Sequence, residues 1–289
     1  MQRFPTIGVV AKRDDAISDT LAALLAYLRA QDVTVHTDAG CAALMPERLQ
    51  ACTAEQLRAC SLVIVIGGDG TLLHAGRALA PAGVPILGIN QGRLGFMVDV
   101  APDEMIASVA EVLAGSFHEE QRIMLSARVE REDATVKRMV AVNDLVIRNQ
   151  AAIRMIEFET ALDDGFISTH RADGIIIATP TGSTAYALSG GGPIIHPGVN
   201  AVALVPICPH ALSDRPVVVS ADREIRVRLK DGPRVRAVCT ADGQQNDALE
   251  AEDTLCITRA EKPLRLVHPP SYNYFEVLRT KLHWGRDRV

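Results

Sequence analysis

The first 118 residues alternate short apolar runs with helix-like segments, and this alternation is the feature that most restricts the fold. Strand-like runs occur at residues 6–11, 33–36, 61–66 and 84–90, and helix-like segments occur at 17–30 and 71–80. The alternation is typical of parallel βαβ units, because parallel neighbours need a long crossover connection. The sequence therefore predicts an α/β domain with a Rossmann-like parallel sheet over residues 1–118.

The next part of the chain changes to one strand-like run after another. These runs lie at residues 125–131, 139–149, 153–164, 165–179, 216–220, 224–229, 234–240 and 253–260, and acid-rich or glycine turns separate several of them. Such texture is typical of antiparallel β folds. We therefore predict a β-rich domain over residues 119–271, with a C-terminal helix over 272–289 that completes the first domain.

Composition limits the classes of partner. The formal net charge of −5 argues against a general binder of polyanions, and an aromatic share of 4% leaves few stacking platforms for nucleic-acid bases. A local pocket for one phosphorylated small molecule stays open. No stretch approaches the ~18 apolar residues that a membrane helix needs, and the N-terminus lacks a secretory signal. We expect a cytoplasmic protein without nucleic-acid or membrane partners.

The six cysteines are scattered and form no C-x-x-C pair, so neither a zinc site nor a disulfide framework is indicated. We expect reduced thiols in the core and no metal site built by the protein.

The segment GGDGT, Gly67 to Thr71, directly follows the apolar run SLVIVI. Glycines allow a phosphate to approach the backbone closely, and the helix predicted next would offer its positive N-terminal end. Gly67, Gly68, Gly70 and Thr71 are therefore candidates for a phosphate-donor loop, and Asp69 is a candidate general base. The alternative is a helix-capping aspartate in a tight turn.

The stretch RADGIIIATPTGSTAYALSGGGPI, residues 171–194, joins a buried strand to a loop rich in small hydroxyl side chains. Hydroxyl and N–H groups at a helix start suit a phosphorylated ligand, and Tyr186 offers a flat face for a base. The alternative for the glycines at 190–192 is simple helix termination. A third segment, VND, places an amide, Asn143, beside a carboxylate, Asp144, and such a pair can bind ribose hydroxyls.

Common nucleotide-binding fingerprints are missing, since the chain has neither a P-loop pattern nor a clean G-x-G-x-x-G. Instead, GGDGT, GRLGF, VND, TPTGSTAYALSGGGP, SDRP and HPPSYNYFEVLRTKLHW resemble, in order and spacing, the motifs of bacterial NAD kinases. The resemblance covers nearly the whole chain. The TPTGSTAY loop is the more specific motif, since diacylglycerol and sphingosine kinases share GGDGT.

The resemblance implies a fold of the NAD kinase and diacylglycerol kinase type, with the site enclosed between the two domains. It implies Mg²⁺-dependent transfer of a phosphoryl group from ATP or polyphosphate to the 2′-hydroxyl of the adenosine ribose of NAD, giving NADP. Mg²⁺ would arrive with the donor phosphates. A homodimer or homotetramer is also implied.

The resemblance assigns Asp69 as the proton acceptor, a role that suits phosphoryl transfer to a hydroxyl. Other positions matching ligand-facing residues of the family are Gly70, His74, Asn143, Asp144, Arg154, Arg171, Asp173, Thr184, Ala185, Tyr186, Ala187, Leu188, Ser189 and Gln244. Two positions depart from the family pattern, since many relatives carry Glu where this chain has Asp144, and His74 falls at a variable position.

Two other functions stay open on the sequence alone. A lipid kinase would share GGDGT, but the TPTGSTAY loop suits a dinucleotide, and no membrane-binding stretch is visible. A catalytically silent NAD(P)-binding sensor would keep the pocket, and only the presence of Asp69 speaks against it.

Overall fold

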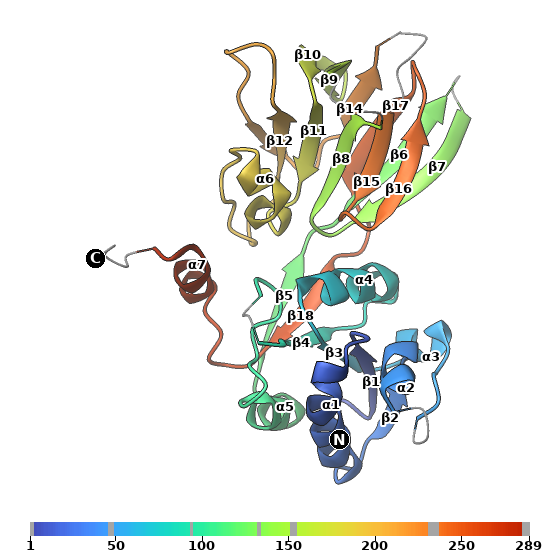
Figure 1. Ribbon diagram of the computed structural model, residues 1–289, viewed down its shortest axis with the longest axis vertical. Coiled ribbons are helices and arrows are strands. Elements are labelled where there is room, and N and C mark those ends of the chain that lie inside the picture. The colour runs from blue at the N-terminus through green and yellow to red at the C-terminus, as the bar shows by residue number, and fades with distance from the viewer. Residues whose placement is uncertain are drawn as a thin grey trace. The chain divides into compact units, whose positions relative to one another are not determined.

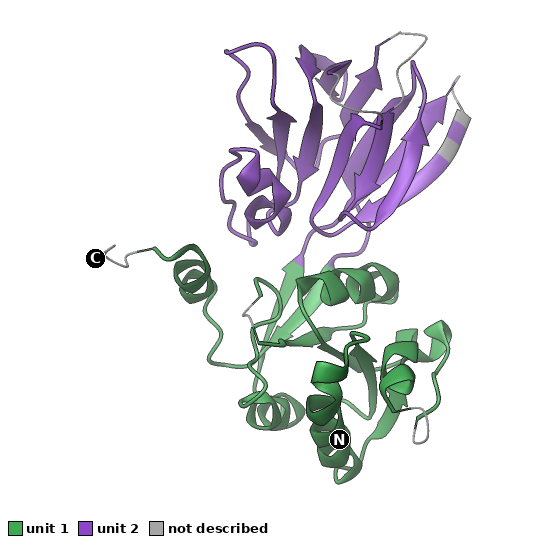
Figure 2. Cartoon of the chain, in the orientation of Figure 1, with its two compact units in different colours: residues 1–121, 264–289 green, residues 122–263 purple. Residues whose placement is uncertain are grey.

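The computed structural model describes residues 3–45, 49–92, 95–131, 134–150, 155–230 and 237–284 (Figure 1). The chain divides into two compact units (Figure 2). Unit 1 comprises Met1–Gln121 and Leu264–Val289, and unit 2 comprises Arg122–Pro263. The chain thus leaves unit 1, builds unit 2, and returns to unit 1 with its last segment.

Unit 1 contains a six-stranded sheet of the order β2-β1-β3-β4-β18-β5. Its strands are β1 (Thr6–Ala11), β2 (Thr34–Thr37), β3 (Leu62–Ile66), β4 (Ile86–Ile89), β5 (His118–Arg122) and β18 (Leu264–His268). The pairs from β2 through to β18 are parallel, which confirms the predicted parallel sheet. Every residue of β3 is fully buried, as its unbroken apolar run indicates.

The helices of unit 1 are η1 (Asp15–Ile17), α1 (Ser18–Arg29), α2 (Ala39–Leu44), α3 (Ala54–Arg58), α4 (Asp69–Leu79), η2 (Ala80–Ala82), α5 (Met105–Leu113) and α7 (Tyr274–Leu282). On α1, Leu21, Leu24 and Leu28 recur at helical spacing and are completely buried in the core of the unit. This packing of an apolar helix face on the sheet holds the loops at the strand ends in place.

The strand β18 lies in the sheet of unit 1, between β4 and β5. The sequence places residues 264–271 in the second domain instead. A short apolar strand has the same sequence pattern in either unit, so the pattern alone does not show at which residue the chain returns to unit 1.

Unit 2 consists of two antiparallel sheets whose apolar faces share one core (Figure 1). The first sheet has the order β10-β9-β14-β17-β6-β7, with β6 (Leu125–Arg131), β7 (Ala134–Ala141), β9 (Ile156–Leu162), β10 (Gly165–Ala172), β14 (Ile225–Leu229) and β17 (Thr254–Arg259). The second has the order β13-β12-β11-β8-β15-β16, with β8 (Asp144–Asn149), β11 (Gly174–Ala178), β12 (Ala201–Ile207), β13 (Val217–Ser220), β15 (Ala237–Ala241) and β16 (Gln245–Leu249).

The sequence reads residues 139–149 and 165–179 as single strands, and the structure corrects both. The first run breaks at Val142–Asn143, between β7 and β8, and the second breaks at Asp173, between β10 and β11. In each case the two halves belong to different sheets. Strand-like residues continue on both sides of each break, so this texture alone does not reveal the change of sheet.

All six cysteines are free thiols, but only Cys41, Cys60, Cys239 and Cys256 are buried. Burial raises the pKa of the Cys60 thiol to about 11. Cys208 is exposed and Cys52 is half-buried, so the prediction of core positions was wrong for these two. Within the described residues, no helix has the length and apolar character needed to span a membrane.

Candidate functional site

The loop Gly67–Thr71 connects β3 to α4 in unit 1. A Cβ atom added to Gly67 would lie 2.6 Å from Oγ1 of Thr71, so the fold leaves no room for a side chain there. Gly68 is the N-cap of α4 and Asp69 is its first residue. The loop thus lies at the carboxyl end of a parallel strand and at the positive end of a helix, the usual place for a phosphate in α/β folds.

The Asp69 carboxylate accepts hydrogen bonds from three consecutive backbone N–H groups. Oδ2 accepts from Phe96 at 2.9 Å, and Oδ1 accepts from Met97 at 3.0 Å and from Val98 at 3.3 Å. A Cβ added to Gly95 would lie 2.2 Å from Oδ1, so the loop packs directly against the carboxylate. Asp69 is therefore not the cap of its own helix, and its orientation is fixed by the loop at 95–98.

Gly70 and His74 are exposed on the first two turns of α4. Asp69 is half-buried, although its neighbours Gly68 and Gly70 are both exposed. Arg93 and Leu94, in the GRLGF motif, lie outside the described residues. The ligand roles of Gly70 and His74 stay predictions.

Unit 2 contains a pocket of about 480 Å³ on the β8, β15 and β16 part of its second sheet. The pocket is lined by Asn143, Asp144, Val146, Arg148, Ala185, Tyr186, Thr240, Asp242, Gly243 and Asn246. Four of the sequence-predicted site residues, Asn143, Asp144, Ala185 and Tyr186, meet here. Two motifs that lie forty residues apart in the sequence therefore converge on one pocket.

The two polar side chains of the VND motif differ in what surrounds them. Asp144 is only 5% exposed, and burial together with the nearby charge of Asp242 raises the pKa of its carboxyl group to about 7. Oδ1 of Asn143 is buried and has no hydrogen-bond partner among the described residues. The pocket is thus lined by an amide side chain with an unused acceptor and by a carboxyl group that changes its charge near neutral pH.

The backbone that carries Asn143 and Asp144 is held from two sides. On one side, the Asp242 carboxylate accepts N–H bonds from Val142, Asn143 and Asp144, at 3.0, 2.7 and 3.3 Å. On the other side, Thr179 donates its N–H to the Asn143 carbonyl at 2.8 Å and its hydroxyl to the Val142 carbonyl at 2.6 Å. The break between β7 and β8 is therefore fully hydrogen-bonded.

The TPTGSTAY loop folds against this same backbone. It forms η3 (Gly182–Thr184) and α6 (Tyr186–Ser189), and a Cβ added to Gly182 would lie 2.1 Å from the Asn143 carbonyl oxygen. The Ser183 hydroxyl is completely buried and accepts the Ile195 N–H at 2.9 Å. Two of the small residues thus fix the loop itself, and the ring of Tyr186, 45% exposed, lines the pocket.

The other residues predicted within this loop have different surroundings. The Thr184 hydroxyl donates to the Thr181 carbonyl, and Ala187 is completely buried in a small apolar cluster of unit 2. Leu188 is half-buried and Ser189 is exposed. The glycines 190–192 follow α6 directly, and the Gly192 N–H returns to the Ala187 carbonyl, which is the structural role considered for them.

Of the other predicted residues of unit 2, the described ones Arg171, Asp173 and Gln244 do not line this pocket. Arg171 is exposed and its carbonyl accepts the N–H of His210, while Asp173 is half-buried at the junction of β10 and β11. Gln244 is exposed beside Gly243 in the turn between β15 and β16. Arg154 lies outside the described residues. Their ligand contacts stay predictions.

Sequence reasoning missed several pocket residues, namely Val146, Arg148, Thr240, Asp242, Gly243 and Asn246. A period of two would have found Val146 and Arg148, which alternate with Asp144 along β8. Thr240 pairs with Val146 across the ladder, and its hydroxyl donates to Asn246 at 2.7 Å. That pairing depends on contacts about a hundred residues apart, for which a single sequence gives no signal.

Within the described part of the chain, no three His, Cys, Asp or Glu side chains are grouped so that they could hold a metal ion. The carboxylates of Asp69 and Asp242 are each occupied by backbone N–H groups.

Comparison with known proteins identifies the family. Models of the ATP-NAD kinase N-terminal and C-terminal domains match residues 8–117 and 142–269. An NAD kinase of Teredinibacter turnerae is 45% identical over 99% of this chain and 98% of its own length. An NAD kinase of Methylococcus capsulatus is 43% identical over 98% of each protein.

Solved structures share the fold. Yeast NADH kinase in complex with NADH matches 99% of this chain and 89% of its own, with a TM-score of 0.88 and 22% identity. An Archaeoglobus fulgidus NAD kinase in complex with ATP matches 96% of this chain and 97% of its own, with a TM-score of 0.75 and 25% identity. The fold is thus that of nucleotide-dependent NAD(H) kinases. The chain belongs to the ATP-NAD kinase family, which confirms the resemblance seen in the sequence motifs.

Proposed function

We propose that this protein is an NAD kinase that transfers the terminal phosphoryl group of ATP, or of polyphosphate, to the 2′-hydroxyl of the adenosine ribose of NAD. The observation that carries the proposal is the convergence of Asn143, Asp144, Ala185 and Tyr186 on one pocket of unit 2. An amide acceptor and a carboxyl group suit ribose hydroxyls, and an exposed aromatic ring suits a base. Membership of the family gives independent support.

Asp69 is the proposed general base. Each carboxylate oxygen has two acceptor positions. Oδ2 accepts the backbone N–H of Phe96 and, among the described residues, keeps a second position that can accept the proton of a hydroxyl. The three N–H bonds fix the direction of the carboxylate before the substrate arrives, which is the main requirement in phosphoryl transfer. The loop Gly67–Thr71 and the N-terminal end of α4 would bind the donor phosphates.

We propose that Mg²⁺ enters with the donor phosphates, because the described carboxylates of the two loops are engaged by backbone N–H groups. When bound, the ion would neutralise charge on the transferred phosphoryl group. The protein's own part is to align the hydroxyl and to accept its proton.

Family membership favours this function over the two alternatives. The relatives matched over the full chain are named NAD kinases, whereas a lipid kinase would share only the GGDGT loop. A silent NAD(P)-binding sensor is disfavoured for a different reason. A protein that only binds NAD(P) would not need three backbone N–H groups to hold the Asp69 carboxylate in one orientation.

We further propose a cytoplasmic protein that forms a homodimer or a homotetramer. Four buried free thiols suit a reducing compartment. The oligomer is proposed from the family resemblance and is tested directly by light scattering coupled to size-exclusion chromatography.

The test of the proposed function is direct. Purified protein is incubated with NAD, Mg²⁺ and either ATP or polyphosphate, and NADP is detected with an NADP-specific dehydrogenase. Formation of NADP that depends on both the donor and NAD is the expected result. Phosphorylation of diacylglycerol, or calorimetric binding of NAD without any NADP, would instead establish one of the two alternatives.

A further inference from the structure

The inference concerns Asp242, which neither the sequence motifs nor the proposed chemistry assigns. It stands at the turn between β15 and β16, in the left-handed region of the backbone with φ 51°, and Gly243 follows at φ 65°. Its own N–H donates to the Asp144 carbonyl at 3.0 Å. Asp242 therefore contacts the 142–144 backbone through both its main chain and its side chain.

The segment 142–144 needs such a partner. Val142 and Asn143 lie outside the strands, so the sheet ladders do not provide partners for their N–H groups. An unsatisfied buried N–H group is strongly destabilising. One carboxylate accepts both of these N–H groups and also that of Asp144, the first residue of β8, and bonds to a charged acceptor are stronger than those to a neutral one.

We propose that Asp242 is a positioning residue for the NAD pocket: its carboxylate fixes the backbone from which Asn143 and Asp144 reach the substrate. The proposal rests on the proposed function, because it assigns NAD to this pocket. Asp242 does not need to touch NAD for this role. It acts by holding the backbone that carries the Asn143 and Asp144 side chains.

The charge of Asp242 has a second effect on the same site. The charged or titratable side chains that line the pocket around Asp144 are Asp242, Arg148 from β8 and Tyr186 from α6. The negative charge of Asp242 contributes to the raised pKa of the Asp144 carboxyl group. Removing that charge should lower the pKa of the Asp144 carboxyl group. This group would then stay ionised at a lower pH, so NAD affinity should begin to fall only at a lower pH.

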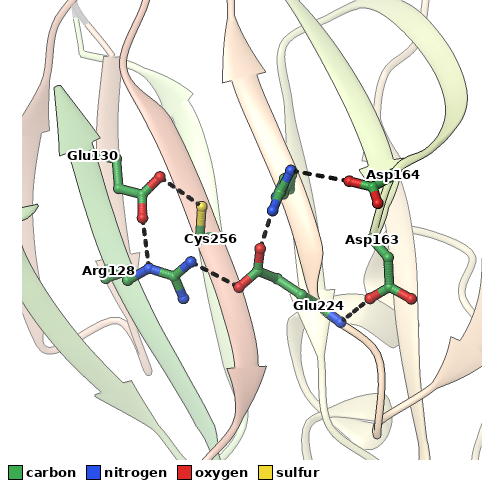
Figure 3. Close-up of polar contacts among 7 residues, drawn as sticks. Arg128, Glu130, Asp163, Asp164, Glu224 and Cys256 are labelled. Carbon is green, nitrogen blue, oxygen red and sulfur yellow. Dashed lines mark hydrogen bonds and ion pairs between the residues drawn. The ribbon is translucent and has the colours of Figure 1, made fainter. Parts of the chain in front are cut away.

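The chain offers a matched control at Asp163, in the turn between β9 and β10. Asp163 has φ 50°, its carboxylate accepts the Glu224 N–H at 2.9 Å, and its N–H donates to the Glu224 carbonyl at 2.7 Å (Figure 3). It also forms an ion pair with Arg223. This turn thus shares with the Asp242 turn a left-handed aspartate whose carboxylate accepts a backbone N–H, but it accepts one such bond instead of three, and it lies in the other sheet, away from the residues that line the pocket.

The experiment compares Asp242→Asn with Asp163→Asn. Asparagine tolerates the left-handed region, so the turn is kept, but the amide NH₂ group cannot accept the third N–H bond. We expect the dissociation constant for NAD to rise about tenfold in Asp242→Asn, because a tenfold rise corresponds to the loss of one charge-assisted hydrogen bond. In Asp163→Asn the dissociation constant should change less than twofold. The pH profile of NAD binding should move to lower pH only in Asp242→Asn.

A second measurement does not depend on NAD. Hydrogen exchange of the Val142, Asn143 and Asp144 amides should accelerate at least tenfold in Asp242→Asn and stay unchanged in Asp163→Asn. Unchanged exchange in Asp242→Asn, or equal effects of both variants on NAD affinity, would overturn the positioning role. A wild-type protein that forms no NADP would contradict the proposed function instead, and the exchange result would still decide the role of Asp242.

Discussion

Units 1 and 2 each contain an aspartate that accepts three consecutive backbone N–H groups, but the two aspartates serve opposite purposes. In unit 1, the loop at 96–98 orients the Asp69 carboxylate, which is the group proposed to act. In unit 2, the Asp242 carboxylate orients the backbone at 142–144, whose side chains are proposed to act. We therefore propose that the same set of bonds fixes a base in one unit and a binding surface in the other.

The different roles proposed for Asp69 and Asp242 predict different kinetic effects, one on kcat and one on KM for NAD. Disturbing the loop around Asp69 should lower kcat, because the proton acceptor is displaced while the pocket of unit 2 is intact. Disturbing the backbone at 142–144 should raise KM for NAD, because Asn143 and Asp144 are displaced.

Among the substitutions that leave Asp69 and Asp242 themselves unchanged, the largest effect is expected for Gly95→Ala. The new Cβ would lie 2.2 Å from Oδ1 of Asp69 and 2.4 Å from Cγ2 of Val98, so the loop must move away from the carboxylate. We expect kcat to fall by about 10²-fold, which is the lower range for loss of a general base, with KM for NAD within about threefold. Steady-state kinetics measure both. A large rise in KM with an unchanged kcat would contradict the separation.

The next effect is expected for Gly182→Ala in unit 2. Its Cβ would lie 2.1 Å from the Asn143 carbonyl oxygen, so the TPTGSTAY loop must separate from the 142–144 backbone. Overpacking of this kind destabilises by about 1–3 kcal/mol, and we expect KM for NAD to rise by about 10- to 100-fold. The control is Gly198→Ala, whose Cβ would meet only the His196 ring at 3.3 Å or beyond. Equal KM values for the two variants would refute the expectation.

A smaller effect concerns stability and pH. The pKa of Asp144 is raised to about 7 from an ordinary value of 3.8, so the folded state keeps a proton that the unfolded chain has lost. The stability of unit 2 should therefore fall as the pH rises from 5 to 8, by about 3 kcal/mol, and level off above that range. Asp144→Asn should remove this slope. Hydrogen exchange of the buried amides of β11 at several pH values measures it, and an unchanged slope would contradict the assignment.

The smallest effect is expected for Tyr186→Ala. The ring is 45% exposed and lines the pocket, so its loss should weaken NAD binding without disturbing the core. An aromatic contact contributes about 0.5–1.5 kcal/mol, which corresponds to a rise in KM of up to about tenfold. Tyr186→Phe should keep most of the affinity. A large effect of the phenylalanine variant would show that the hydroxyl group, rather than the ring face, binds the substrate.

The sequence predicted the parts of the molecule that depend on local pattern. The α/β alternation predicted the parallel sheet, and the motifs predicted the loops that bear Asp69, Asn143 and Tyr186. The strand breaks at Val142–Asn143 and at Asp173 were not predicted, because strand-like residues continue on both sides of each change of sheet. Asp242 was not predicted either, because its three partners lie about a hundred residues away in the sequence.

The central claim, that one device fixes a base in unit 1 and a binding surface in unit 2, is tested by comparing Asp69→Asn with Asp242→Asn. Both variants keep the size of the side chain and remove its charge, and each is assayed for kcat, for KM and for NAD binding by calorimetry. We predict that Asp69→Asn lowers kcat by ~10²–10⁴-fold and leaves NAD affinity within about threefold, whereas Asp242→Asn weakens NAD affinity about tenfold and changes kcat far less. An Asp69→Asn enzyme that keeps its kcat, or two variants with the same kinetic profile, would contradict the account.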